Sequence, residues 1–453
     1  MPRQIPFLLC IGFILWLLRQ DVRSRGYASP ALLVPGLWLA LVCSRPLDFW
    51  VGTNAGISST GGNPVNMMGF VLPMIGAFII LAKRGFSWSA FLAGNRAVFL
   101  LYLFYLISMV WSPFPLASCK RIFKDFGCVL MVAVVFSETM PVEAAKLLFV
   151  RLAYVLFPLS VVFIKYFPAI GRVPSRSGEA TFNGVCWQKN SLGQLVFVMG
   201  LFLVWDWLDI RNSPDTPNRK LQLRIRLGVM LIGMWLLWVS DSKTSQICLA
   251  LGILLFWATR QFLQWQHGRR RIIIGLGGVV CLLALNQSLG LTDHIAELLG
   301  READLSGRTL IWKELLKMGT DPVKGWGFYS FWDTPKVQDF YDSEDFNHIS
   351  EAHNGYLEAF FDGGLIAVCL LAVILLRAGK RVMDRLFTGT SFGRLAFVFW
   401  FLALIYNNSE SSFFRMSPLW FTFLLFTMDY PSLPAGPASI AVEESEDAVH
   451  SAA

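Results

Sequence analysis

Long apolar runs separated by short polar loops are the feature that most limits what this chain can fold into. Of its 453 residues, 55% are hydrophobic and only 15% are charged, whereas a soluble domain has roughly 25% charged residues. A charge in the bilayer core has no water to solvate it, and a helix needs roughly 20 apolar residues to cross. The pattern therefore predicts an all-α, polytopic integral membrane protein.

Thirteen segments are candidate membrane helices, which predicts about 12–13 spans. Several are shorter than a full crossing requires, and the first, fifth, eighth and ninth are also compatible with half-spans or interfacial helices. The segments are residues 5–18, 27–43, 67–82, 97–111, 126–136, 144–164, 191–208, 226–239, 246–259, 272–288, 355–376, 395–407 and 416–429.

The distribution of Lys and Arg among the loops predicts an orientation. Loops on the side of "ATRQFLQWQHGRRRI" hold about twice as many Lys and Arg as the loops on the other side. Because basic loops stay in the cytoplasm, we expect the N-terminus outside and the C-terminus inside. Membrane topology then accounts for the net charge of +8, and no nucleic-acid partner is needed.

This map divides the chain into four parts. Residues 1–288 hold the N-terminal membrane helices, 289–354 a large outer loop, 355–430 the C-terminal membrane helices, and 431–453 an acidic tail. We expect the tail to be disordered and cytoplasmic, because it lacks apolar periodicity. The large loop has helical spacing after Leu305 and Ser306, which ends at Pro322, so we expect it to fold and to pack over the membrane domain.

Two outer segments carry positive charge on the face where it is normally scarce. In residues 165–190, the cations either contact lipid headgroups or bind an anion such as phosphate, and nearby Asn and Gln favour the anion. In residues 111–127, a misplaced span is the favoured explanation, because segment 126–136 is weak. The cations are Lys165, Arg172, Arg176 and Lys189 in the first segment, and Lys120, Arg121 and Lys124 in the second.

His353 lies between the polar loop and an apolar run, at the mouth of a predicted membrane helix. A histidine there is either a structural cap or a general base, because its unperturbed pKa of about 6.5 is close to working pH. Asn354 and Glu358 share one helical face and could orient an acceptor or pair with each other. Glu410 and Arg415 would flank the same vestibule, or would form an ion pair.

An ordered set of motifs resembles one family. "LSGRTLIWKELL", "PVKGWGFYSFW" and "EAHNGYLEAFFDGGLIAV" resemble the large-loop signature of the O-antigen ligase and polymerase (Wzy–WaaL) superfamily. Upstream, "FNGVCWQKNSLG" and "SDSKTS" are similar to the versions in ExoQ-type exopolysaccharide polymerases. The motifs cover about residues 172–364 in the family's order.

The resemblance implies a GT-C-like membrane glycosyltransferase of the bacterial inner membrane, with its active site on the periplasmic side. The donor would be a glycan on undecaprenyl diphosphate, and the acceptor a growing glycan or lipid A–core. It implies neither a metal nor another cofactor. Partners would include the bilayer and a chain-length regulator or export proteins. Displacing a diphosphate builds negative charge that fixed cations stabilise, while the attacking hydroxyl must lose a proton.

The resemblance also implies roles for individual residues. Arg308 in "SGRT" matches the family's essential loop arginine, and His353 matches its essential histidine. The third position, which would bind the donor diphosphate, is Arg176 ahead of Arg172, and Lys189 occupies the polymerase-type "KN". His348 is a rival base without the helix-mouth context.

Other chemistry has weaker support in the sequence. The acidic stretch 339–347 could hold a divalent cation, but a solvated acidic loop is the favoured interpretation. Trp326 and Trp332 in the outer loop could stack on sugars. A transporter is disfavoured because the spans hardly carry interior charge. A non-catalytic assembly component stays open, and lipid A–core ligation remains the alternative to polymerisation.

Overall fold

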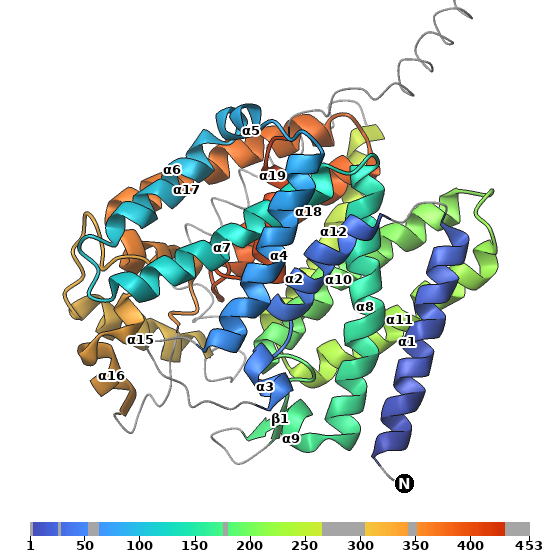
Figure 1. Ribbon diagram of the computed structural model, residues 1–453, viewed down its shortest axis with the longest axis horizontal. Coiled ribbons are helices and arrows are strands. Elements are labelled where there is room, and N and C mark those ends of the chain that lie inside the picture. The colour runs from blue at the N-terminus through green and yellow to red at the C-terminus, as the bar shows by residue number, and fades with distance from the viewer. Residues whose placement is uncertain are drawn as a thin grey trace, which may run out of the picture.

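The computed structural model describes residues 3–25, 29–52, 63–174, 180–264, 304–342 and 351–430, and these residues are mostly helical (Figure 1). The N-terminal half contains α1 (Gln4–Ser24), η1 (Pro30–Leu32), α2 (Leu33–Val42), α3 (Leu47–Val51), α4 (Pro64–Lys83), α5 (Trp88–Gly94), α6 (Arg96–Ser108), α7 (Pro115–Phe136), α8 (Pro141–Tyr166) and α9 (Pro168–Gly171). A short antiparallel hairpin follows, formed by β1 (Arg172–Pro174) and β2 (Ala180–Phe182). The remainder contains α10 (Lys189–Asn212), α11 (Arg219–Ser240), α12 (Lys243–Gln264), α15 (Asp304–Lys317), η2 (Phe331–Asp333), α16 (Pro335–Asp342), α17 (Gly355–Leu386), α18 (Ser391–Tyr406) and α19 (Pro418–Thr427).

The all-α, polytopic membrane architecture is confirmed. Twelve of the predicted segments fall on these helices, and segment 272–288 lies outside the described residues. Among the described helices, seven are long and apolar enough to cross a bilayer, or eight if α5 and α6, which are bent by 92°, form one span. This number is below the predicted 12–13 because α2 with η1, α18 and α19 are short, α7 begins with charged turns, and one segment lies outside the described residues.

Two apolar helices form the centre of the bundle. In α8 and α10, 78% of the apolar window is buried, compared with 28% in α1 and 22% in α4. A helix that is apolar on all sides is expected at the core of a bundle. The outer helices therefore present their exposed apolar faces to lipid.

A break in α17 joins the large loop to the membrane helices. Gly363 and Gly364 leave the helical conformation, and Gly364 has φ +57°. The amide of Leu365 donates to the Pro322 carbonyl at 2.8 Å, and the amide of Trp326 donates to the Phe361 carbonyl at 2.9 Å. The loop thus docks by its backbone against the first turns of α17.

The loops gather at two opposite ends of the molecule. The chain's N-terminus, α9, β1, α15 and α16 lie at one end, and α5 lies at the other (Figure 1). We name these the α15 end and the α5 end. Loops that the charge distribution assigned to the outside contact one another, as in His353–Glu410, Arg121–Asp333 and Thr244–Ser409. Loops assigned to the inside also contact one another, as in Arg25–Glu143, Lys146–Asp209 and Arg84–Glu138.

Candidate active site

His353 occupies the junction between the large loop and α17. Its backbone is left-handed, with φ +50°, an uncommon conformation for a residue other than glycine and one that often marks a functional site. The next residue, Asn354, caps α17, because its Oδ1 accepts from the amides of Tyr356 and Leu357 at 3.0 and 3.1 Å. The cap is therefore Asn354 and not His353, whose side chain is 26% exposed.

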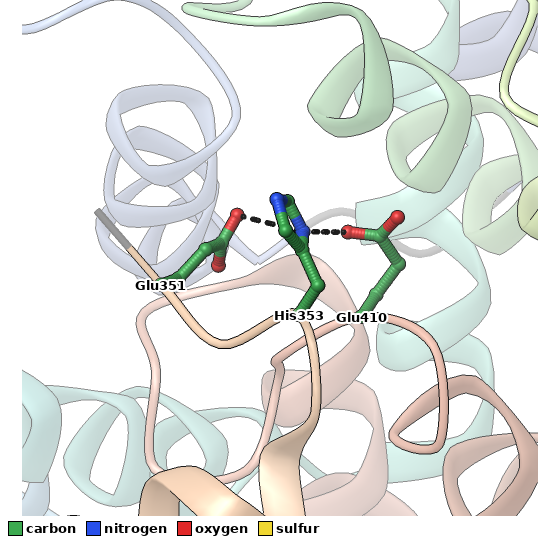
Figure 2. A group of neighbouring side chains, drawn as sticks. All are labelled: Glu351, His353 and Glu410. Carbon is green, nitrogen blue, oxygen red and sulfur yellow. Dashed lines mark hydrogen bonds and ion pairs between the residues drawn. The ribbon is translucent and has the colours of Figure 1, made fainter. Parts of the chain in front are cut away.

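Two carboxylates contact the imidazole of His353. Its Nδ1 lies 3.1 Å from Glu410 Oε2 and 3.5 Å from Glu351 Oε1 (Figure 2). Glu410 comes from the turn after α18, and its Oε1 accepts from Asn190 Nδ2 at 2.9 Å. Gln188 Nε2 contacts Glu351 at 3.5 Å. Three segments far apart in the sequence thus meet at His353.

This arrangement can make His353 an oriented base. A proton on Nδ1 that points to Glu410 places the lone pair on Nε2. The carboxylates also stabilise the imidazolium that forms when Nε2 accepts a proton. Burial raises the pKa of Glu351 and the nearby Glu410 charge raises it further, whereas His353 opposes the shift.

The same three residues are candidate metal ligands. One ligand atom from each of Glu351, His353 and Glu410 lies within 4.8 Å of the others. An imidazole and two carboxylates are a donor set that divalent metals accept in proteins. The sequence did not indicate this site; its acidic candidate was residues 339–347, of which 343–347 lie outside the described residues.

A buried ionic network centred on Arg415 links the large loop to α17 next to His353. Arg415 donates to Glu358 Oε2 at 2.6 Å and to Asp362 Oδ2 at 2.9 Å, and its guanidinium lies 3.5 Å from the ring centre of Tyr329. Glu358 also accepts from Trp332 Nε1 at 2.8 Å. Of the alternatives left open by the sequence, the pairings are not the ones that form: Glu358 pairs with Arg415, and Glu410 contacts His353. The side chains of Arg415, Glu358 and Asp362 are each at most 8% exposed. Removing one of them would leave a buried ion without its countercharge.

A cavity of about 370 Å³ opens beside this cluster, lined by Arg121, Tyr329, Trp332, Asp333, Glu351 and Arg415 among others. Arg121 lies 2.7 Å from Asp333 Oδ2 and donates to the Tyr329 carbonyl at 2.8 Å. It is 25% exposed, so it remains accessible from the cavity. The explanation by a misplaced span was correct in part, because segment 126–136 is only the second half of α7. The sequence did not show that the first turns of α7 bring Arg121 to the cavity.

The other predicted site residues have different positions. Arg172 on β1 donates to the Ile164 carbonyl at 2.9 Å and lies over the Phe182 ring, so its contacts are within the hairpin region. Lys189 opens α10 between Gln188 and Asn190, whose side chains reach Glu351 and Glu410. Trp326 is partly buried in the loop's own apolar cluster, and its Nε1 donates to Thr320.

Three predicted residues cannot be placed by their side chains. Arg176 and His348 lie outside the described residues, and Arg308 lies on α15 where only the backbone is described. Sequence reasoning gave no role to Glu351 and gave Asn190 only a general one. The sequence feature that could have identified Glu351 and Asn190 is their position within the motifs "EAHNGYLE" and "QKN".

Comparison with known proteins gives two matches. Residues 227–372 match a family described as O-antigen ligase (Wzy_C). The exopolysaccharide production protein ExoQ of Rhizobium meliloti (strain 1021) is 24% identical over 309 residues, which cover 65% of this chain and 67% of that protein. The family match includes Glu351 and His353. Residues 227–372 are thus similar to the O-antigen ligase family, and about two thirds of the chain is similar to an exopolysaccharide production protein.

Proposed function

We propose that this protein transfers a glycan from undecaprenyl diphosphate to a sugar hydroxyl at the periplasmic face of the inner membrane, and that it polymerises the repeat units of an exopolysaccharide. The similarity to an exopolysaccharide production protein supports polymerisation. The family description supports the alternative, ligation of the glycan to lipid A–core.

The observation that carries the proposal is the position of His353 between Glu351 and Glu410, beside a cavity whose lining includes Arg121 and Arg415. In this reaction the acceptor oxygen bonds to the anomeric carbon while the bond to the diphosphate oxygen breaks. Nε2 of His353 takes the proton of the attacking hydroxyl. The leaving diphosphate departs as an anion without a protonating acid, and cations stabilise its charge.

The cations proposed to bind the diphosphate are Arg176, Arg308 and Lys189, now joined by Arg121. Among the described residues, Arg121 has a single carboxylate partner, Asp333, and it lines the cavity, so an incoming phosphate can compete for its guanidinium. Arg172 is a weaker candidate, because its Nε is engaged by a backbone carbonyl.

A second hollow offers a path for the lipid part of the donor. It measures about 190 Å³ and is lined by residues of α2, α3, α4 and the loop between α2 and α3, most of them apolar, together with Lys124 and Met416. Lys124 is one helical turn from Arg121, and Met416 follows Arg415, so the residues that line the two hollows adjoin along the chain. An isoprenoid chain in this hollow would place its diphosphate near the first turns of α7.

The function is tested with purified protein and a lipid-linked repeat unit. Wild type should form polymer and release undecaprenyl diphosphate, and His353→Gln should reduce the rate by roughly 10²–10⁴-fold while donor binding persists. Transfer only to lipid A–core would favour the ligase. Absence of transfer to either acceptor, with an intact donor, would contradict the enzymatic proposal.

Metal independence is tested in the same assay. We expect EDTA to leave the rate unchanged, because His353 acts as a base and not as a ligand. A loss that Mn²⁺ or Zn²⁺ restores in wild type but not in Glu351→Gln would instead assign Glu351, His353 and Glu410 to a metal.

The orientation is tested by labelling cysteines in intact cells, in a variant without Cys119 and Cys369. Lys317 at the α15 end is 70% exposed, so Lys317→Cys should react with an impermeant maleimide. Lys220→Cys at the α5 end should react only after lysis. The reverse pattern would place His353 on the cytoplasmic side.

A further inference from the structure

A second polar cavity lies at the α5 end, away from His353. It measures about 420 Å³ and is bounded by the last turns of α10 and α12 and the first turn of α18. Its lining includes Asp209, Arg260, Leu263, Gln264, Ser391 and Arg394. None of these residues has a part in the proposed transfer reaction.

One of the two arginines of this cavity, Arg394, has a buried donor without an acceptor. Arg394 Nε is buried without an acceptor, and its guanidinium lies 4.8 Å from the centre of the Phe256 ring. Over the residues that the structure describes, neither Arg394 nor Arg260 forms a salt bridge. The two cations also repel each other. Because a buried donor without an acceptor costs free energy, an anion in the cavity would stabilise this arrangement.

The nearby negative charge does not fill this role. Asp209 lines the cavity, but its Oδ2 lies 2.7 Å from Lys146 Nζ on α8. The first turn of α18 adds further positive potential, because helix N-termini carry partial positive charge. Thr390 caps this helix by accepting from the Gly393 amide at 3.1 Å. The cavity therefore has a net attraction for an anion with several acceptor oxygens.

The surface next to the cavity is apolar and faces outward. Along α12, Ile253, Leu254 and Trp257 are 40%, 56% and 62% exposed, and Trp257 precedes Arg260 by one turn on the same face. Exposed apolar side chains on a membrane helix contact acyl chains. A ligand with a phosphate headgroup and apolar tails fits both the cationic cavity and the apolar face of α12, whereas a free phosphate fits only the cavity.

We propose that this cavity binds the phosphate headgroup of an anionic phospholipid, with Arg260 and Arg394 as its donors and α12 as the surface for its acyl chains. Basic pockets between membrane helices commonly bind such headgroups. The proposal is independent of the transferase function, because it concerns the opposite end of the molecule.

The test measures binding and thermal stability of the full-length protein in a neutral detergent. Phosphatidylglycerol should bind and raise the melting temperature, whereas phosphatidylcholine and inorganic phosphate should not. Arg394→Gln and Arg260→Gln should each weaken phosphatidylglycerol binding by about tenfold or more, since each removes a charge-assisted hydrogen bond. Arg260 is exposed, so its substitution removes little packing.

The matched control is Lys220→Gln, which removes one exposed charge from α11 and should leave binding unchanged. Equal stabilisation by phosphatidylcholine, or full phosphatidylglycerol binding in both arginine variants, would overturn the proposal. Binding of inorganic phosphate as tight as that of phosphatidylglycerol would replace the lipid with a soluble phosphate.

Discussion

Replacement of Glu410 by glutamine is the substitution that most directly tests the proposed base. Glu410 accepts from Asn190 through Oε1 at 2.9 Å and contacts His353 Nδ1 through Oε2 at 3.1 Å. A glutamine has only one acceptor oxygen for these two donors. If that oxygen faces Asn190, the amide donates to Nδ1 and moves the imidazole proton to Nε2, where the base needs its lone pair.

The size of the effect follows from the charge that is lost. Two unit charges 3.1 Å apart attract with about 5 kcal/mol at an effective dielectric constant of about 20, before the cost of desolvation. A hydrogen bond to a charged group contributes about 1.5–3 kcal/mol net. At about 1.4 kcal/mol per factor of ten, kcat should fall by about 10- to 150-fold. Glu351 at 3.5 Å still shares the charge, which favours the lower end.

The assay is transfer from a lipid-linked donor by purified protein, with kcat and donor KM measured separately. Glu410→Gln should lower kcat and change KM little, because Glu410 acts on the imidazole through its 3.1 Å contact with Nδ1. The matched control is Glu314→Gln, an exposed acid on α15 that pairs with Lys317. The same substitution in a His353→Gln background should add less than a factor of about three, since coupled residues are not additive. A full additional loss there would refute the view that Glu410 acts through His353.

Three further substitutions have expected outcomes. Glu351→Gln should raise the melting temperature at neutral pH and leave it equal to that of wild type at low pH. Burial raises the pKa of Glu351, so its ionised form destabilises the folded protein as pH rises, and this cost is absent when the group is protonated. An equal gain at all pH values would contradict this reasoning. Arg415→Met should lower the free energy of unfolding by about 3–5 kcal/mol, because it leaves the buried Glu358 without its countercharge. The protein should then lose its monodisperse peak in size-exclusion chromatography. A normal peak would show that the network is dispensable. Gly364→Ala should lower the melting temperature much more than Gly319→Ala. Both glycines have a positive φ, but only at Gly364 would the new Cβ lie 2.4 Å from a backbone carbonyl. Equal effects would mean that the break in α17 does not hold the loop.

Local apolar composition was sufficient to predict most of the helices. The twelve predicted segments in the described regions coincide with helices, because a run of apolar residues in lipid must satisfy its backbone hydrogen bonds internally. The same logic failed for the first half of α7, where Lys120, Arg121 and Lys124 lie on a helix that continues into the core. A hydropathy pattern cannot show that a charged turn is covered by a loop some 200 residues away.

The site was predicted by residue but not by contact. The position of His353 at the helix mouth followed from the change from polar to apolar sequence. Its carboxylate partners did not, because Glu410 arrives from a turn more than fifty residues away. The left-handed backbone of His353 and the cap by Asn354 leave the imidazole to contact Glu351 and Glu410, and composition predicts neither feature.

The cations of the α15 end differ in how far their charge is already neutralised, which gives a physical criterion for their roles. Arg415 has two carboxylates and an aromatic ring as partners and is 7% exposed, so removing it from Glu358 and Asp362 to bind a substrate would leave two buried anions unpaired. Its role is therefore to hold the loop on α17. The Arg121 side chain is 25% exposed, about three times the 8% of the Arg415 side chain, and over the described residues it has one carboxylate partner. A diphosphate can therefore replace Asp333 at modest cost, and Asp333 can turn to water. A cation that binds and then releases a diphosphate must be able to exchange partners, and at this cavity Arg121 meets that condition better than Arg415.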